Sequence, residues 1–347
     1  MSFRRNNGNY IECEPFRPHF IMGLESSCDE TSVAVLADGK DILANLVSTQ
    51  IPLHAKYGGV VPEVACRAHM EVVNPLISEA LETAGIAMTD LNAIAVTCGP
   101  GLVGAVLLGV AAAKTLAGCL DIPLIGVNHL EGHLFSALLE KPDLPLPLIC
   151  LLVSGGHTMI CRVDGPGRYE VLGSTRDDAA GEAFDKVSKA LGMGYPGGPK
   201  IQAMAGKGNV KAVHFSRPML NDGYDFSFSG LKTAVLLHLQ SEERASDADV
   251  CAAFQDAVVD VLAVKAMRAV RQCGAKSLAL AGGVAANKAL RERLSSDAAK
   301  SGIEFTCPRL DLCTDNAVMI ARAGWELANE GLCSPLSLDA KPNLDLV

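Results

Sequence analysis

The sequence lacks several features that would assign it at once to a class of protein. Its 12 cysteines form no CxxC pair, and those at positions 98, 119, 150 and 161 lie within apolar runs. Such cysteines are typical of buried free thiols in a reducing compartment. Aromatic residues make up only 5% of the chain, whereas glycine is frequent, with 33 residues. This balance favours an α/β protein with closely packed helices and sheets.

The sequence also lacks a basic surplus and a long apolar segment. Its formal net charge is −9, so any contact with RNA must come from a local patch or from a partner protein. The first 20 residues hold no apolar run typical of a signal peptide. Residues 101–113 are the most apolar stretch, but Lys114 interrupts them before they could span a bilayer. We predict a cytoplasmic protein without membrane association, in which this stretch is a buried helix.

Two parts of the chain begin alike, which indicates a duplicated unit. After a loose extension at 1–18, the segments HFIMGLE, SSCDE and TSVAVLA predict a strand, a polar turn and a strand. The same pattern returns in LICLLV, SGGH and TMICRV, directly after the proline-rich KPDLPLPL. A chain of 347 residues suffices for two domains. We infer a duplicated α/β unit with a nucleotide cleft between its halves, although hairpins with glycine turns are common by chance.

The remaining pattern predicts helices and one further strand. Helices are expected at 179–191 and 249–273, and the strand KSLALAGG is expected to run directly into the helix AANKALRERL. A final helix is expected at 315–330, starting from the polar cap TDN.

The motif HLEGH is a candidate metal site. His129 and His133 stand four residues apart, which on a helix places both imidazoles on one face. Glu131 lies about 200° round the helix from His129, so it is badly placed as the base of a zinc peptidase. Asp315, at the start of the final helix, is a candidate third ligand. From this motif alone, a pair of structural histidines is an equally good interpretation.

Two glycine-containing turns are candidate phosphate sites. In LVSGGHT, the backbone N–H groups of Ser154–Gly156 are unobstructed and can hold phosphate oxygens, although an ordinary hairpin turn has the same sequence. In AGGVAAN, the glycine pair lets the backbone approach a base or sugar, and the following helix start favours phosphate. The pattern is not GxGxxG, which disfavours a dinucleotide site. Asn287 either contacts a purine or caps the helix.

Two groups of carboxylates are also candidates. Asp185 lies beside the apolar stripe of its helix and before the Gly197–Gly198 turn, so it is placed either to bind ribose hydroxyls or simply to face solvent. Asp29 and Glu30 lie in the first hairpin turn, where they would bind a metal or steer an amine nucleophile. Ordinary turn chemistry explains them equally well.

The order of the motifs is more specific than any one of them. GLESSCDETSVAVL, GGVVPEVACRAH, GPGLVGAVLLGVAAAKTLA, NHLEGHL, LLVSGGHT, DDAAGEAFDKVSKALGMGYPGGP, FSFSGLKT, AGGVAANKALRERL and CTDNAVMIA follow one another between about residues 20 and 330. Together they resemble the bacterial TsaD (formerly Gcp) family, the transferase subunit that makes N6-threonylcarbamoyladenosine in tRNA.

The resemblance implies an actin/Hsp70/sugar-kinase-like α/β fold, with duplicated RNase H-like domains and a nucleotide cleft between them. The first domain would comprise 19–147 plus 315–347, and the second 148–314. The implied reaction moves the threonylcarbamoyl group from threonylcarbamoyl-AMP to N6 of the adenosine next to the anticodon, in tRNAs reading ANN codons.

Site residues follow from the same resemblance. His129, His133 and Asp315 would hold one metal ion, with Fe²⁺ preferred and Zn²⁺ as the alternative, and Asp29 and Glu30 would contribute to catalysis. Gln202 stands where the family usually has an acidic residue, so the nucleoside contact there would pass through an amide. The implied substrate-binding residues are Leu152, Val153, Ser154, Gly155, Gly156, Asp185, Gly198, Gln202 and Asn287.

The resemblance implies partners, and two other functions stay open. The family works with a paralogous scaffold subunit (TsaB-like) and a small ATPase subunit (TsaE-like), and the apolar helix at 101–116 would pack against either the paralogue or the core. A metallopeptidase is the first alternative, but it needs a base near the metal. An actin-like ATPase that only binds partners is the second, but it does not need a His–His–Asp site.

Overall fold

The computed structural model describes residues 10–57 and 59–346, which form two compact α/β units. The first unit holds the described residues up to Leu139, Pro166–Arg168 and the chain from Thr314 onward, and the second holds Glu140–Gly165 and Tyr169–Cys313. The division falls at 139/140, where the sequence-based boundary is 147/148. The proline-rich stretch belongs to the second unit because Lys276 donates its N–H to the carbonyl of Pro147 (3.3 Å).

The first unit is built on a five-stranded sheet within the described residues, in the order β4-β3-β2-β5-β6. The predicted hairpin is confirmed, since β2 and β3 pair antiparallel, whereas β2, β5 and β6 run parallel. Strands β2 and β5 are buried almost throughout, in agreement with their apolar sequences. The strands are β2 (Phe20–Glu25), β3 (Glu30–Ala37), β4 (Asp41–Thr49), β5 (Ala93–Gly99) and β6 (Leu124–Asn128).

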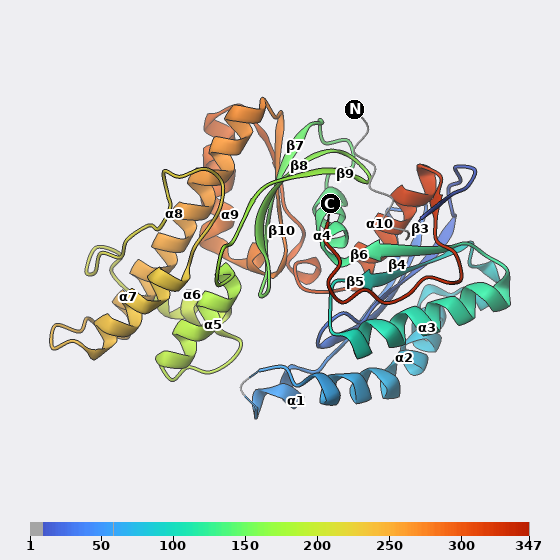
Figure 1. The fold of residues 1–347 in the computed structure, drawn as a ribbon, viewed down its shortest axis with the longest axis horizontal. Helices are drawn as coiled ribbons and strands as arrows, with labels where there is room; N and C mark the ends of the chain where they lie inside the picture. Colours follow the sequence, from blue (N-terminus) through green and yellow to red (C-terminus); the bar gives the residue numbers. More distant parts are fainter. Residues whose placement is uncertain (1–9, 58, 347) are drawn as a thin grey trace. The chain divides into compact units, whose positions relative to one another are not determined.

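Helices cover both faces of this sheet. Helices α2 and α3 contact each other and strands β3 and β5, and both can be followed in Figure 1. Helix α10 contacts β2, β3 and β5 and also packs against α4. The helices are α1 (Ile51–Ala55), α2 (Pro62–Ala84), α3 (Val103–Leu120), α4 (His129–Leu138) and α10 (Ala317–Asn329).

Helix α3 differs from the predicted buried helix. It continues past Lys114, whose ammonium donates to the carbonyl of Leu338 (2.9 Å). Only 33% of its residues are buried, and Val103 and Leu107 are exposed. Within the described chain, α3 is long and apolar enough to cross a membrane by length and composition alone, a test that core helices of soluble proteins also pass. It packs on one side only.

The N-terminal segment is not loose where the structure describes it. Strand β1 (Ile11–Glu12) pairs antiparallel with β12 (Leu332–Cys333). The carbonyl of Pro18 accepts a hydrogen bond from the indole N–H of Trp325 (3.2 Å). The expectation of a loose segment is therefore wrong for residues 10–18, while residues 1–9 lie outside the described residues.

The second unit repeats the strand order of the first. Its described residues form a five-stranded sheet in the order β11-β10-β7-β8-β9, in which β7 and β8 are antiparallel and β7, β10 and β11 are parallel. Counted from the hairpin, both sheets have the order 3-2-1-4-5, which confirms the predicted duplication. The strands are β7 (Leu148–Val153), β8 (Thr158–Gly165), β9 (Arg168–Ser174), β10 (Ser277–Ala281) and β11 (Glu304–Thr306).

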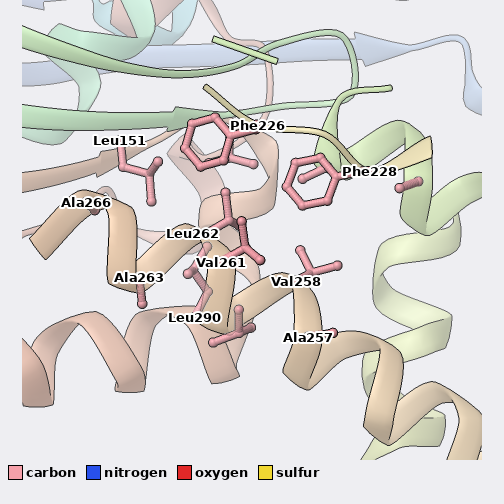
Figure 2. Close-up of a cluster of buried hydrophobic side chains, with 14 of the residues drawn as sticks. Leu151, Phe226, Phe228, Ala257, Val258, Val261, Leu262, Ala263, Ala266 and Leu290 are labelled. Atoms are coloured by element: carbon pink, nitrogen blue, oxygen red, sulfur yellow. The ribbon is translucent and has the colours of Figure 1, made fainter. Parts of the chain in front are cut away.

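Helix α8 forms the centre of this unit's core. It starts where Ser246 accepts a hydrogen bond from the Asp249 N–H and ends at Gly274, which has φ 60°. Figure 2 shows its buried apolar side chains against Phe226, Phe228 and Leu151. The helices of the unit are α5 (Ala180–Ala190), α6 (Gly197–Ala205), α7 (Ser229–Gln240), α8 (Asp247–Cys273) and α9 (Lys288–Lys300).

The predicted helices are confirmed with small shifts at their ends. The final helix is capped by Asn316, whose side chain accepts from the Met319 N–H (3.1 Å). The strand KSLALAGG does not run directly into a helix: a 3-10 turn at Gly283–Ala286 intervenes, and α9 begins only at Lys288. Gly282 follows the strand with φ 86° and ψ 170°, a backbone conformation that a helix cannot continue.

Candidate functional site

Three predicted metal ligands lie together in the first unit. His129 is the first residue of α4, His133 follows one turn later, and Asp315 precedes α10. Asp315 Oδ1 lies 3.1 Å from His133 Nε2 and 3.5 Å from His129 Nε2. Four-coordinate sites with bonds of about 2.1 Å separate their ligand atoms by roughly 3.4 Å. The two distances to Asp315 match this separation, and all three ligand atoms lie within 4.8 Å of one another, so the three side chains could share one ion.

The hydrogen bonding of His133 fits a metal better than a structural role. The side chain is fully buried, yet neither ring nitrogen has a hydrogen-bond partner within the described chain. Its Nε2 is close to Asp315 without the geometry of a hydrogen bond. Buried polar atoms without partners are costly, and a bound ion would satisfy this one. Two imidazoles and a carboxylate suit Zn²⁺ or Fe²⁺.

Charge around His129 favours its cationic form in the absence of an ion. Burial disfavours the charge, but the carboxylates of Asp315 and Glu25 outweigh it and raise the pKa of His129 to about 9. These two carboxylates therefore stabilise a positive charge at this position, as expected at a site that binds a cation.

Close packing of α4 on α10 brings the ligands together. A Cβ atom at Gly132 would lie 2.7 Å from Ile320 Cδ1, so the glycine of HLEGH permits this approach. Glu131 is buried on another side of α4, where its carboxylate accepts a hydrogen bond from Tyr10 (3.4 Å). Glu131 is not a member of the His–His–Asp cluster, which gives no support to a peptidase base at this position.

The acidic turn lies in the same unit. Asp29 is buried and Glu30 is half-buried at the start of β3. Burial and the neighbouring Asp29 raise the pKa of Glu30 to about 9. Glu30 therefore holds a proton at neutral pH.

His69 of α2 forms hydrogen bonds to this turn. The sequence did not single it out. It is fully buried, its Nε2 lies 3.0 Å from the carbonyl oxygen of Cys28, and its Nδ1 lies 2.7 Å from the Thr31 hydroxyl. Because the carbonyl can only accept, Nε2 carries the hydrogen, and Nδ1 accepts from Thr31. His69 thus bonds to the residues on either side of Asp29 and Glu30.

This environment predicts a loss of stability in acid. Burial lowers the pKa of His69, so the folded state stays neutral while the unfolded chain takes up a proton below about pH 6.5. The unfolded state then binds more protons than the folded state. The free energy of unfolding therefore decreases as the pH is lowered, by at most about 1.4 kcal/mol per pH unit. Urea unfolding at pH 7.5 and 5.5 should show a smaller pH effect in His69→Asn than in the wild type. Exposed His214→Asn is the control, and its free energy of unfolding should depend on pH as in the wild type. A His69→Asn variant with the same pH dependence as the wild type would contradict the prediction.

In the second unit, the SGGH turn follows the buried strand end at Leu152 and Val153. Ser154 closes the turn: its N–H donates to the carbonyl of His157 (2.7 Å), and its hydroxyl accepts from the His157 N–H (3.0 Å). Gly155 and Gly156 are exposed, and no described atom would lie within 4 Å of a Cβ at either. The turn is therefore open to solvent around these two residues, which leaves room for a phosphate.

Two other glycines bring neighbouring segments against this turn. A Cβ at Gly282 would lie 2.5 Å from the carbonyl oxygen of Val153, and one at Gly181 would lie 2.5 Å from that of Ser154. Gly181 also donates its N–H to Ser154 (3.2 Å). Since β7 and β10 are parallel, the SGGH and AGGVAAN motifs meet at the same end of the sheet, where α/β proteins commonly bind ligands.

Three of the other predicted substrate residues, Asp185, Gln202 and Asn287, have hydrogen-bond partners in the protein. Asp185 accepts from the Gly197 N–H (2.6 Å), and burial raises the pKa of its carboxyl. Gly198 has open space around its Cα hydrogens. Gln202 accepts from the Lys288 N–H (2.6 Å). Asn287 caps α9 and donates its amide to Gln255 (2.9 Å), which is the capping role that the sequence left open.

Comparison with known proteins decides the family. The chain matches the family described as TsaD, tRNA N6-adenosine threonylcarbamoyltransferase, over residues 41–322. It is 52% identical over 331 residues to the tRNA N6-adenosine threonylcarbamoyltransferase of Clostridium perfringens, which covers 94% of this chain and 98% of that protein. The protein of the same name from Syntrophotalea carbinolica is also 52% identical over 331 residues, with 94% and 96% covered. The chain belongs to the TsaD family.

Solved structures confirm the predicted fold class of this TsaD-family chain. HypF of T. kodakarensis has a TM-score of 0.63 at 16% identity, covering 94% of this chain and 49% of that one. Component A of the (R)-2-hydroxyglutaryl-CoA dehydratase of Acidaminococcus fermentans has a TM-score of 0.55 at 17% identity, covering 89% and 98%. At these identities the likeness concerns the fold alone, which is of the actin/Hsp70-like ATPase type.

The predicted site residues and their neighbours thus group within each unit. His129, His133 and Asp315 form one cluster, and the SGG turn, Gly282 and the start of α5 form another. Sequence reasoning missed His69 and Gly181, because a lone histidine in an amphipathic helix and a glycine near a helix start carry no distinctive pattern.

Proposed function

We propose that this protein transfers a threonylcarbamoyl group from threonylcarbamoyl-AMP to N6 of the adenosine next to the anticodon in tRNAs reading ANN codons. Membership in the TsaD family along nearly the whole chain carries the proposal, because the relatives that share half of its residues are named for this transferase. Tight positioning would do much of the work, since an exocyclic amine is a weak nucleophile.

One divalent ion would be held by His129, His133 and Asp315. The spacing of the three ligand atoms and the unpartnered nitrogens of His133 support this, and both Fe²⁺ and Zn²⁺ suit the ligands. When bound, such an ion supplies Lewis-acid polarisation and neutralises phosphate charge.

The second unit would bind the donor. The amides of the exposed residues Gly155 and Gly156 would donate to its phosphate or carbonyl oxygen and stabilise the negative charge that develops there. Leu152 to Ser154 would form the base of that turn, and Asp185 and Gly198 would contact the nucleoside. Because Gln202 and Asn287 have protein partners, their part would be to fix the start of α9 beside the ligand.

A carboxylate of the first unit would take the proton from the attacking amine. Asp29 and Glu30 are the candidates. Glu30 holds its proton at neutral pH, since burial and the neighbouring Asp29 raise its pKa to about 9. Asp29 is therefore the better candidate for the base.

Partner subunits would supply what the chain lacks. A net charge of −9 is poorly suited to tRNA on its own, so a TsaB-like scaffold and a TsaE-like ATPase would complete the assembly in the cytoplasm. The exposed apolar residues Val103 and Leu107 of α3 are the surface we assign to the scaffold subunit.

Reconstitution tests the activity directly. The chain would be incubated with threonine, bicarbonate, ATP, unmodified tRNA, the donor-forming enzyme and both partner subunits, and the tRNA nucleosides analysed by mass spectrometry. We expect N6-threonylcarbamoyladenosine only when the chain is present. Absence of this nucleoside from the complete mixture, with hydrolysis of ATP or of a peptide instead, would replace the proposal by one of the two alternatives.

A further inference from the structure

Glu25 is a buried carboxylate at the end of β2 that neither the sequence nor the proposed reaction has used. Its side chain is 0% exposed. Three donors reach it: the Ser27 N–H (2.5 Å, to Oε1), the Thr97 hydroxyl (2.5 Å, to Oε2) and His129 Nδ1 (3.0 Å, to Oε2). A buried carboxylate needs such partners, and here one of them is a predicted metal ligand.

These contacts determine which nitrogen of His129 faces the ligand cluster. An ionised carboxylate can only accept hydrogen bonds, so Nδ1 of His129 carries the hydrogen that points at Glu25. The hydroxyl oxygen of Ser27 lies 3.1 Å from the same nitrogen. Nε2 is left on the side of Asp315, at 3.5 Å from its Oδ1. The orientation of the ring is therefore fixed, and Nε2 is the nitrogen left to bind an ion.

The carboxylate is itself held from a second strand. Thr97 is fully buried in β5, next to β2, and its only side-chain donor points at Glu25. The chain of contacts Thr97–Glu25–His129 thus links two parallel strands to the first residue of α4. Glu25 and Thr97 are fully buried and the side chain of His129 is only 10% exposed, so the fold fixes the geometry of these contacts.

We propose that Glu25 is a positioning residue that holds His129 with Nε2 directed at the metal, and that Thr97 in turn orients Glu25. This rests on the metal site of the proposed function. The alternative is that Glu25 only joins β2, β5 and α4 mechanically. The two differ in their effect on metal affinity and on the tautomer of His129.

The test measures Zn²⁺ affinity of the metal-free full-length protein by competition with a chromophoric chelator. We expect Glu25→Gln to weaken Zn²⁺ binding by about 10- to 100-fold, the usual effect of removing such a partner. Glu326→Gln is the matched control, because Glu326 is a largely buried carboxylate paired with Arg322 on α10. It should cost stability without changing Zn²⁺ affinity.

A second readout reports the tautomer itself. In the Zn²⁺-loaded wild type, ¹⁵N spectra of the imidazoles should show His129 protonated at Nδ1 and bound through Nε2. In Glu25→Gln the Nδ1–H resonance should shift and exchange faster with water. A mechanical role alone would leave the ring bound to Zn²⁺ through Nε2 with wild-type affinity in Glu25→Gln, whatever the shift of this resonance.

Two further variants keep the outcome decisive. If Glu25→Gln does not fold, Thr97→Val decides: it should weaken Zn²⁺ binding in the same direction but less, whereas exposed Thr115→Val should not. If the wild type binds Zn²⁺ but both Glu25→Gln and Thr97→Val bind it equally well, the role of Glu25 is refuted and the metal site stands. If the wild type does not bind Zn²⁺, or His129→Ala binds it as tightly, the metal site and this inference fall together.

Discussion

His129→Ala should abolish metal binding and reduce threonylcarbamoyl transfer by about a thousandfold or more, while the protein stays folded. The ion's contribution to transition-state stabilisation is typically several kcal/mol, and each 1.36 kcal/mol is a factor of ten in rate. The substitution removes one of three ligand atoms and leaves a bidentate site of low affinity. It also takes a donor from buried Glu25, which should lower the free energy of unfolding by roughly 1–3 kcal/mol.

The measurements are metal content by elemental analysis, the rate of nucleoside formation in the complete mixture, and unfolding by urea. His214→Ala is the matched control, since this histidine is exposed in the second unit. It should keep the metal content and the rate of the wild type. A His129→Ala protein that retains one ion per chain and transfers at the wild-type rate would show that the His–His–Asp cluster is not the metal site.

Of the substitutions proposed, Gly282→Ala should destabilise the protein most, lowering the free energy of unfolding by roughly 3 kcal/mol or more. Gly282 has φ 86° and ψ 170°, a backbone region that is essentially confined to glycine and costs other residues about 1–3 kcal/mol. The new methyl group would also lie 2.5 Å from the carbonyl oxygen of Val153, which is backbone and cannot rotate away. The end of β10 would have to move from β7, and the SGGH turn would move with it.

Gly283→Ala supplies a control one residue away. Its φ is not positive, and no described atom would lie within 4 Å of its Cβ, so we expect a change within about 0.5 kcal/mol. Urea unfolding followed by circular dichroism gives the free energies, and hydrogen exchange of the β7 and β10 peptides locates the change. Equal stability of the two variants would mean that the chain accommodates a side chain at Gly282 without strain.

Much of the fold was accessible from local patterns. The two hairpins were predicted because each joins two apolar strands through a turn of small polar residues, and local patterns of this kind depend little on distant contacts. Helix α3 was predicted less well. Apolar composition indicates that a helix can be buried, but which of its faces finds a partner depends on α2 and β5, so Val103 and Leu107 remain exposed.

The candidate site divides in the same way. The sequence by itself determined the spacing of His129 and His133 on one helix face, the open turn at Gly155–Gly156 and, through the order of its motifs, the family. Only the tertiary structure decided that Asp315 lies beside those histidines and that Asn287 is a helix cap. It also decided that Glu25 and His69 form hydrogen bonds to residues of the site. The physical reason is that a helical repeat fixes neighbours within four residues, whereas contacts across 20 to 200 residues are set by how strands and helices pack.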